Sequence, residues 1–180
     1  MSESRPRYRI VLAKEDFKFS AAHFTLFPGG GAELLHGHNY RVRVELSGSD
    51  LDEEGLLVDI DLFKRHLRER CARLDSRTLL PAENARLQWT REGSSIEVRC
   101  GERLYRFPAE DTLLLPLVNT SMELFAEMLW RELAPVLAGS RVDHLAVAVE
   151  EALGQMCWCE ARLGLKTPGA PTSSSPASSN

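Results

Sequence analysis

The amino-acid sequence predicts an α+β fold in which an antiparallel four-stranded sheet carries two helices on one face. Residues 8–24, 38–48, 142–150 and 156–163 alternate apolar and polar side chains, as strands with one buried face do. Two segments between them repeat apolar residues at helical spacing. Strands at both ends of the chain, with helices between, are typical of domains whose helices cover one side of an antiparallel sheet.

The first predicted strand, residues 8–24, is expected to break at a bulge near residues 14–16, where three charged side chains interrupt the alternation. Residues 27–31, Phe-Pro-Gly-Gly-Gly, predict a loop. Its glycines could let the backbone pass close to a ligand, or the loop could be a mobile connection, and the composition fits both readings. The chain then enters the second strand, residues 38–48.

The first predicted helix follows Asp59, whose carboxylate can accept hydrogen bonds from free backbone N–H groups. The opposite side of this helix is charged, which indicates a solvated face rather than a nucleic-acid site. A capping-box pattern at residues 120–123, Thr-Ser-Met-Glu, begins the second helix. The apolar side of the first helix consists of Ile60, Phe63, Leu67, Cys71 and Leu74.

Residues 86–107 predict an inserted β-hairpin, with a turn near Gly101. The insertion could cover a site as a lid or pack against another subunit. One domain is expected, flanked by two segments that have little to bury and should be disordered. The boundaries are residues 1–7 for the N-terminal segment, 8–165 for the domain and 166–180 for the Ser/Pro-rich tail.

Charge and composition exclude several classes of function. A net charge of −4 argues against a nucleic-acid partner, which would favour a basic surface. No apolar run is long enough to cross a membrane, and the first residues lack the apolar core of a signal peptide, so a cytoplasmic protein is expected.

The four cysteines are too few and too scattered to predict a disulfide framework. Cys157 and Cys159 share a strand face and could be a ligand pair or small buried residues.

Three histidines predict a metal site. His36 and His38 are two residues apart on a strand and therefore point the same way, while His23 ends the preceding strand-like run. If the two strands pair antiparallel, all three imidazoles can meet. Three neutral imidazoles around zinc leave a fourth position open, which is typical of a catalytic site. Copper, nickel and iron are not excluded by this ligand type.

These motifs carry a resemblance to a known family. Residues 19–23, Phe-Ser-Ala-Ala-His, and residues 36–40, His-Gly-His-Asn-Tyr, resemble the 6-pyruvoyl-tetrahydropterin synthase / 6-carboxy-tetrahydropterin synthase family. The likeness continues through residues 57–59, 74–75 and 147–150 and so covers most of the chain. It implies the tunnelling (T) fold, in which sheets join into a barrel as a trimer, usually stacked into a hexamer. It also implies active sites between subunits and Zn²⁺ held by the histidine triad.

The resemblance also implies a lyase that rearranges or shortens the side chain of 7,8-dihydroneopterin or its triphosphate. Glu150 would anchor the pterin, because a carboxylate matches the two-donor edge of that ring. The alternative is a surface glutamate at a strand end. Thr120 and Ser121 resemble a hydroxyl pair near the pterin ring, and the alternative for them is helix capping.

The sequence departs from the common family pattern at two places. Ala32 occupies the position of the usual cysteine base, and Glu33 matches the type III subgroup, in which a glutamate replaces that cysteine. Such enzymes produce 6-hydroxymethyl-dihydropterin. Burial would raise the pKa of such a glutamate towards neutral pH, while a nearby metal ion would oppose the rise. The alternative for Glu33 is a plain loop acid. Asp75 is present, but Ser76 stands where a histidine normally acts as proton relay.

Three hypotheses therefore remain open. The first is a zinc-dependent pterin lyase, and the second is a zinc- and pterin-binding homologue whose catalysis is weakened because Ser76 replaces the relay histidine. The third is a structural zinc protein without a small ligand. The sequence does not distinguish the folate, tetrahydrobiopterin and queuosine branches of pterin chemistry.

Overall fold

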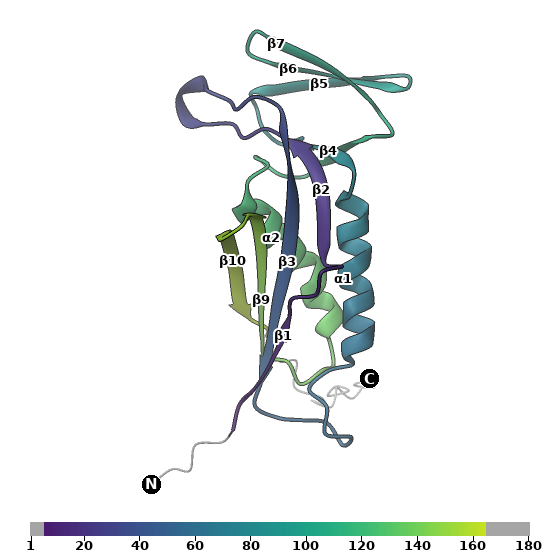
Figure 1. Ribbon diagram of the computed structural model, residues 1–180, viewed down its shortest axis with the longest axis vertical. Coiled ribbons are helices and arrows are strands. Elements are labelled where there is room, and N and C mark those ends of the chain that lie inside the picture. The colour runs from purple at the N-terminus through teal and green to yellow at the C-terminus, as the bar shows by residue number, and fades with distance from the viewer. Residues whose placement is uncertain (1–5, 165–180) are drawn as a thin grey trace, which may run out of the picture.

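The computed structural model describes residues 6–164, which fold around one twisted sheet with two helices on one face (Figure 1). This arrangement confirms the predicted α+β class. The sheet has seven strands rather than four. Six of them lie side by side in the order β10 (Gln155–Arg162), β9 (His144–Ala152), β3 (His36–Gly48), β2 (Lys18–His23), β4 (Arg77–Pro81) and β8 (Thr112–Leu115), and β1 (Tyr8–Leu12) pairs with β3 off this path. Most of the expected terminal segments, 1–7 and 166–180, lie outside the described residues. Arg7, the last residue of the expected N-terminal segment, belongs to the described residues, and its guanidinium pairs with Asp143.

The first three strands form the part of the sheet that carries the histidines. The strands β1 and β2 both pair antiparallel with the long strand β3, and the break between them falls at residues 13–17, close to the expected bulge. The loop between β2 and β3 contains a short 3₁₀ turn, η1. The bounds are Tyr8–Leu12 for β1, Lys18–His23 for β2, Pro28–Gly30 for η1 and His36–Gly48 for β3.

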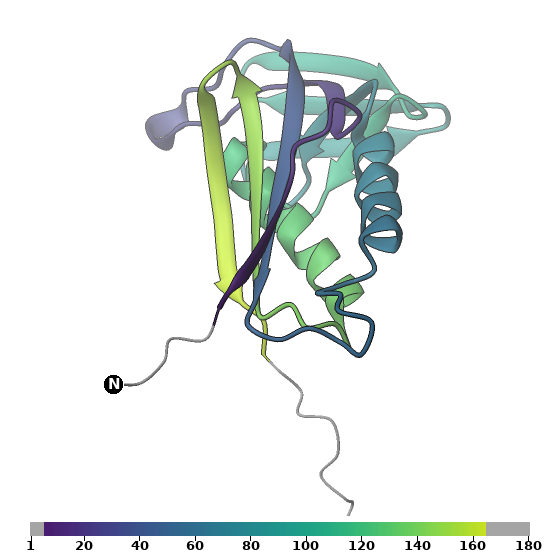
Figure 2. The same ribbon diagram turned by 60° about the horizontal axis from the view of Figure 1, so that its bottom comes forward.

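α1 begins where its capping residue predicts, whereas α2 begins one residue later than the capping-box pattern predicts, because Ser121 rather than Thr120 is its cap. Asp59 accepts hydrogen bonds from the N–H groups of Asp61 and Leu62 at 3.1 and 3.0 Å, and α1 follows. The Ser121 side chain caps α2, which continues into a 3₁₀ turn, η2. Figure 2 shows both helices on the same side of the sheet. The bounds are Ile60–Leu74 for α1, Met122–Leu133 for α2 and Ala134–Leu137 for η2.

The core fills the space between these helices and the inner face of the sheet. Phe19 stacks on Tyr40 with ring centroids 4.7 Å apart, and Phe125 of α2 meets Tyr40 edge-on at 5.5 Å. All three side chains are fully buried. The last two strands extend this inner face, with β9 spanning His144–Ala152 and β10 spanning Gln155–Arg162. None of the described helices is long and apolar enough to cross a membrane.

Two strands at the other side of the sheet correct the prediction of a purely antiparallel sheet. β4 (Arg77–Pro81) pairs parallel with β2, and β8 (Thr112–Leu115) pairs parallel with β4. Both are short apolar runs without alternation, and such runs do not distinguish a buried strand from other buried segments. The four strands predicted from alternation therefore include neither β4 nor β8.

The insertion is a three-stranded antiparallel sheet rather than a hairpin. The second turn, at residues 101–102, matches the prediction, and the additional turn lies at Gly93. Both turns use glycine with positive φ, 57° at Gly93 and 59° at Gly101. The small sheet lies at the end of the main sheet near the loop between β2 and β3 (Figure 1). Its strands are β5 (Leu87–Glu92), β6 (Ser95–Cys100) and β7 (Arg103–Pro108).

Gly48, the last residue of β3, tests how tightly the opposite end of the main sheet is packed. A Cβ atom at this position would lie 2.2 Å from the Arg141 carbonyl oxygen and 2.6 Å from Leu57 Cδ1. We expect Gly48→Ala to lower the free energy of unfolding by about 1–3 kcal/mol, because overpacking displaces backbone. Chemical denaturation measures the change. Gly31→Ala is the control, since its Cβ would meet nothing closer than 3.9 Å; equal stability of the two variants would contradict the packing.

Candidate metal and substrate site

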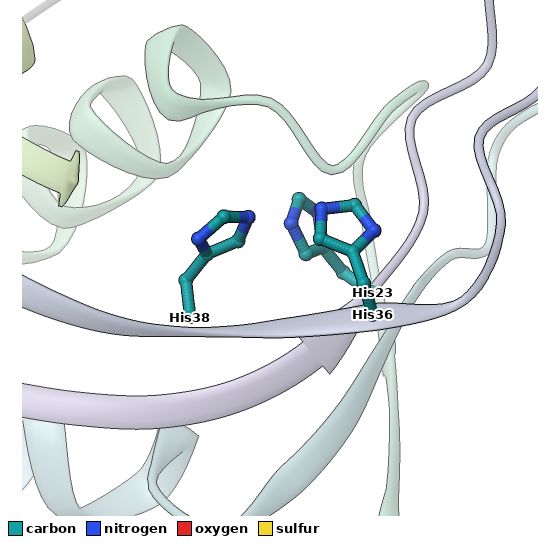
Figure 3. Close-up of side chains that lie close together, drawn as sticks. All are labelled: His23, His36 and His38. Atoms are coloured by element: carbon teal, nitrogen blue, oxygen red, sulfur yellow. The ribbon is translucent and has the colours of Figure 1, made fainter.

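Three imidazoles converge at the end of the inner face of the sheet. His23 is the last residue of β2 and pairs directly with His36, the first residue of β3, and His38 follows on the same face of β3. Ring centroids are 4.7 Å apart for His23 and His36, 4.7 Å for His36 and His38, and 5.4 Å for His23 and His38. One ring nitrogen from each residue lies within 4.8 Å of the other two. The predicted convergence is confirmed (Figure 3).

Hydrogen bonds to backbone carbonyls fix the tautomer of His23 and His36 so that Nε2 is the nitrogen able to bind a metal ion. The Nδ1 atoms of His23 and His36 lie 2.8 Å from the carbonyl oxygens of Thr120 and Leu34, respectively. A carbonyl oxygen can only accept, so each Nδ1 carries the hydrogen and each Nε2 keeps its lone pair. Burial lowers the pKa of His23, which favours the neutral ring. Three imidazoles with this geometry fit a zinc-type ion.

Two residues that the sequence analysis did not select complete this face. The Tyr40 hydroxyl lies 2.8 Å from His23 Nε2 and 3.1 Å from Glu151 Oε1, and its single hydrogen can be donated to only one of these two acceptors at a time. The same carboxylate oxygen is 3.3 Å from His23 Nε2 and 3.4 Å from His38 Nε2. Burial, reinforced by the Glu151 charge, raises the pKa of Tyr40, so its hydroxyl stays protonated and can hold the carboxylate.

The structure does not bring Glu150 to the histidines. Glu150 pairs with Arg41 across β9 and β3, and this register places its side chain on the opposite face of the sheet. There it accepts from Arg43 and from the Gly154 N–H, both at 3.0 Å. The hydrogen bond from the Gly154 N–H, followed by the charges of Arg43 and Arg41, lowers the pKa of Glu150. Glu150 therefore holds the turn between β9 and β10.

The position of Glu151 follows from the register between β3 and β9, which the sequence alone does not show. The histidines share a face of β3 with Tyr40 and Val42, and Val42 pairs with Val149 of β9. Side chains two apart on a strand share a face, so the glutamate next to this site is two residues beyond Val149. Glu150 and Glu151 are adjacent at the end of the strand, so the residue type alone does not say which of the two carboxylates faces the histidines.

Glu33 lies beside the triad, as predicted. One of its carboxylate oxygens, Oε2, accepts from the Thr25 N–H at 2.8 Å and lies 4.0 Å from His36 Nε2. Burial opposes ionisation, but the Thr25 hydrogen bonds and the nearby His36 and His23 rings outweigh burial and lower the pKa of Glu33. Burial acts in the expected direction, but it does not set the pKa, because the side chain is only partly buried and accepts a hydrogen bond from a backbone donor.

The hydroxyl pair at the start of α2 is engaged within the chain. Thr120 is fully buried, and its Oγ1 donates to the Phe24 carbonyl oxygen at 2.9 Å. Its own carbonyl holds His23. Ser121 caps α2 through Leu124 N–H at 3.5 Å. The capping alternative thus describes Ser121, and Thr120 supports a candidate metal ligand.

Asp75 and Ser76 lie apart from this chain's triad. Asp75 Oδ1 accepts from the Ser20 N–H at 2.7 Å, and Ser76 Oγ donates to Asp75 Oδ2 at 3.2 Å. Ser20 precedes His23 by three residues on β2, a distance of about 10 Å along a strand. Ser76 borders an open pocket of ≈ 410 Å³ that is also lined by His38 and Asp111. Any direct role at a triad would require the triad of another subunit.

Comparisons with known proteins agree with this geometry. The profile of the 6-pyruvoyl tetrahydropterin synthase family matches residues 12–162. A protein of Methanocaldococcus jannaschii named putative 6-carboxy-5,6,7,8-tetrahydropterin synthase is 28% identical over 141 residues, which cover 77% of this chain and 86% of that protein.

Solved structures extend the agreement to the fold. The 6-pyruvoyl tetrahydropterin synthase of Plasmodium falciparum superposes with a TM-score of 0.80 at 24% identity, covering 87% of this chain and 98% of that one. The Plasmodium vivax enzyme, solved as a catalytic-residue mutant in which a glutamate is replaced by alanine, gives a TM-score of 0.78 at 26% identity and covers 87% and 99% of the two chains. These likenesses confirm the predicted tunnelling fold, and the chain belongs to the 6-pyruvoyl tetrahydropterin synthase family.

Proposed function

We propose that this chain is a zinc-dependent lyase acting on the side chain of 7,8-dihydroneopterin or its triphosphate. The observation that carries the proposal is the meeting of three imidazoles, two of them with Nδ1 held by a backbone carbonyl, beside the carboxylates of Glu33 and Glu151. Membership of the family supports the pterin as substrate.

The candidate metal ligands are His23, His36 and His38. Zinc suits an imidazole-only set, and when bound it would act as a Lewis acid on the oxygens of the substrate side chain. The carbonyls of Thr120 and Leu34 keep the two ring orientations that expose Nε2. Tyr40 keeps Glu151 turned towards the same place.

Glu33 is the candidate general base. Its lowered pKa keeps it ionised at neutral pH, so it can accept a proton from a side-chain hydroxyl. In a cleavage towards 6-hydroxymethyl-dihydropterin, loss of that proton forms a carbonyl as the adjacent carbon–carbon bond breaks. A two-carbon aldehyde leaves, and a proton is added to the carbon that stays on the ring. The Plasmodium vivax neighbour, in which a glutamate is a catalytic residue, supports this role.

Glu151 is the candidate pterin anchor, in place of Glu150. The amino group and the adjacent ring N–H of a pterin form a two-donor edge that a carboxylate matches. Glu151 is partly buried on the face that holds the histidines, whereas both oxygens of Glu150 already have partners on the other face. Glu151 also has partners, Tyr40 at Oε1 and Gln155 at Oε2, so its position on the histidine face is what makes it the candidate.

A zinc- and pterin-binding homologue with weak catalysis is the second candidate. Ser76 favours it, because serine cannot relay protons near neutral pH and its hydroxyl here donates to Asp75. Both candidates fit an oligomer in which subunits share sites. Within the described residues, β8 and β10 end the main sheet as edge strands, and edges of this kind need pairing or cover.

The direct test is turnover by zinc-loaded protein. We expect incubation with 7,8-dihydroneopterin, and separately with its triphosphate, to release glycolaldehyde, acetaldehyde or inorganic triphosphate, which identifies the reaction branch. Sedimentation of the same preparation should give a trimer or a hexamer.

Glu33→Gln should lower kcat by about 10²–10⁴-fold at unchanged zinc content, because the amide cannot accept the proton.

The outcomes separate the candidates. Absence of products from both substrates with fully metallated protein would reject the lyase, and pterin binding by that protein would then support the second candidate. Turnover that Glu33→Gln leaves intact would reject Glu33 as base while keeping the lyase.

The anchor assignment is tested by a matched pair of isosteric variants. We expect Glu151→Gln to weaken the binding of neopterin to zinc-loaded protein by roughly tenfold to hundredfold, since a charge-assisted hydrogen bond is worth about 1.5–3 kcal/mol. Glu150→Gln should leave the Kd within about twofold but lower the melting temperature, because it weakens the contacts with Arg43 and Gly154. Fluorescence titration measures both, and the reverse pattern would restore Glu150 as anchor.

A further inference from the structure

We propose that the small sheet β5–β7 positions the candidate base, and that Arg103 is the positioning residue. This inference rests on the proposed role of Glu33. Arg103 begins β7, and its guanidinium NH1 donates to the carbonyl oxygen of Glu33 at 2.5 Å. The contact joins residues 70 positions apart in the chain.

The Glu33 main chain controls where the carboxylate lies. The Glu33 N–H donates to the Thr25 carbonyl oxygen at 2.9 Å, and the Thr25 N–H donates back to Glu33 Oε2 at 2.8 Å. A β-bridge between Leu26 and Ala32 continues this pairing towards the tip of the loop. The loop is therefore a narrow hairpin, and a shift of its second arm would move the carboxylate relative to His36 Nε2, now 4.0 Å away.

The two sides of the hairpin are held by different elements. Asn119, just before α2, donates to the Leu26 carbonyl oxygen and accepts from the Leu26 N–H, both at 3.0 Å. That side-chain clamp fixes the first arm against the main domain. Among the described residues, the guanidinium of Arg103 is the side chain that donates to the backbone of Glu33 on the second arm.

The inner face of β7 packs against the same hairpin. Tyr105 stacks on Phe24 with centroids 5.6 Å apart and planes inclined by 20°, and Phe107 stacks behind Tyr105 at 5.7 Å. These rings belong to a second hydrophobic cluster, separate from the main core. Its buried members are Phe24, Leu26, Leu80, Leu87, Ile96, Val98 and Ala109.

Alternation along β7 separates this inner face from a solvent face. Arg103, Tyr105 and Phe107 are half-buried and face the hairpin, whereas Leu104 and Arg106 are exposed. Arg106 lies 3.7 Å from Glu92 across the small sheet, with both side chains more than 60% exposed. An exposed pair of this kind contributes little to stability. Arg106 therefore provides a matched control for Arg103.

The test compares Arg103→Ala, Arg103→Lys and Arg106→Ala in the full-length, zinc-loaded protein. We expect Arg103→Ala to lower kcat by roughly tenfold to hundredfold with KM within twofold, because a misplaced base costs rate rather than binding. Arg103→Lys, which keeps one charged donor, should recover part of the loss. Arg106→Ala should match the wild type.

Hydrogen exchange gives a readout that does not depend on turnover. In Arg103→Ala, the peptide covering residues 24–35 should exchange faster than in wild type, while peptides of α1 and β9 and the zinc content stay unchanged. If wild type turns over neither substrate, the proposed lyase fails, and this exchange pattern still decides the inference. Unchanged exchange in Arg103→Ala, or equal loss of kcat in Arg103→Ala and Arg106→Ala, would overturn it.

Discussion

The antiparallel pairing of β2 with β3 is the constraint on which the rest of the site depends. It sets His23 opposite His36 and places His38 one step further along the same face. A shift of one residue in this register would turn the side chains of one strand to the other face and separate the imidazoles. The fully buried rings of Phe19 and Tyr40 oppose such a shift, because either strand would have to expose a large aromatic side chain.

The site continues the core rather than interrupting it. Along the inner face of β3, buried Val42 is followed by Tyr40, which packs its ring in the core and directs its hydroxyl to His23 and Glu151. Beyond Tyr40 the histidines occupy the same row. The rigidity of the core is thereby transmitted to the imidazoles, and backbone carbonyls of neighbouring loops fix their tautomers.

Sequence reasoning located the features that local chemistry determines. The Asp59 cap and the histidine convergence follow from side-chain type and strand alternation, and the structure confirms them. The capping-box pattern located the start of the second helix but placed its cap at Thr120 instead of Ser121. β4 and β8 were missed because short apolar runs lack a period, and their partners lie far away in the sequence. The choice between Glu150 and Glu151 required the register of β9 against β3. Contact between Arg103 and Glu33 depends on tertiary packing and leaves no local pattern.

X-ray absorption spectroscopy of zinc-reconstituted protein tests the central claim most directly, because it reports the ligands of the ion itself. The account predicts about one zinc per chain, three imidazole nitrogens at about 2.0–2.1 Å and one further light-atom ligand. Replacing His36 with Ala should reduce the imidazole count or abolish stoichiometric binding. Sulfur in the ligand shell, or protein that stays metal-free after reconstitution, would contradict it.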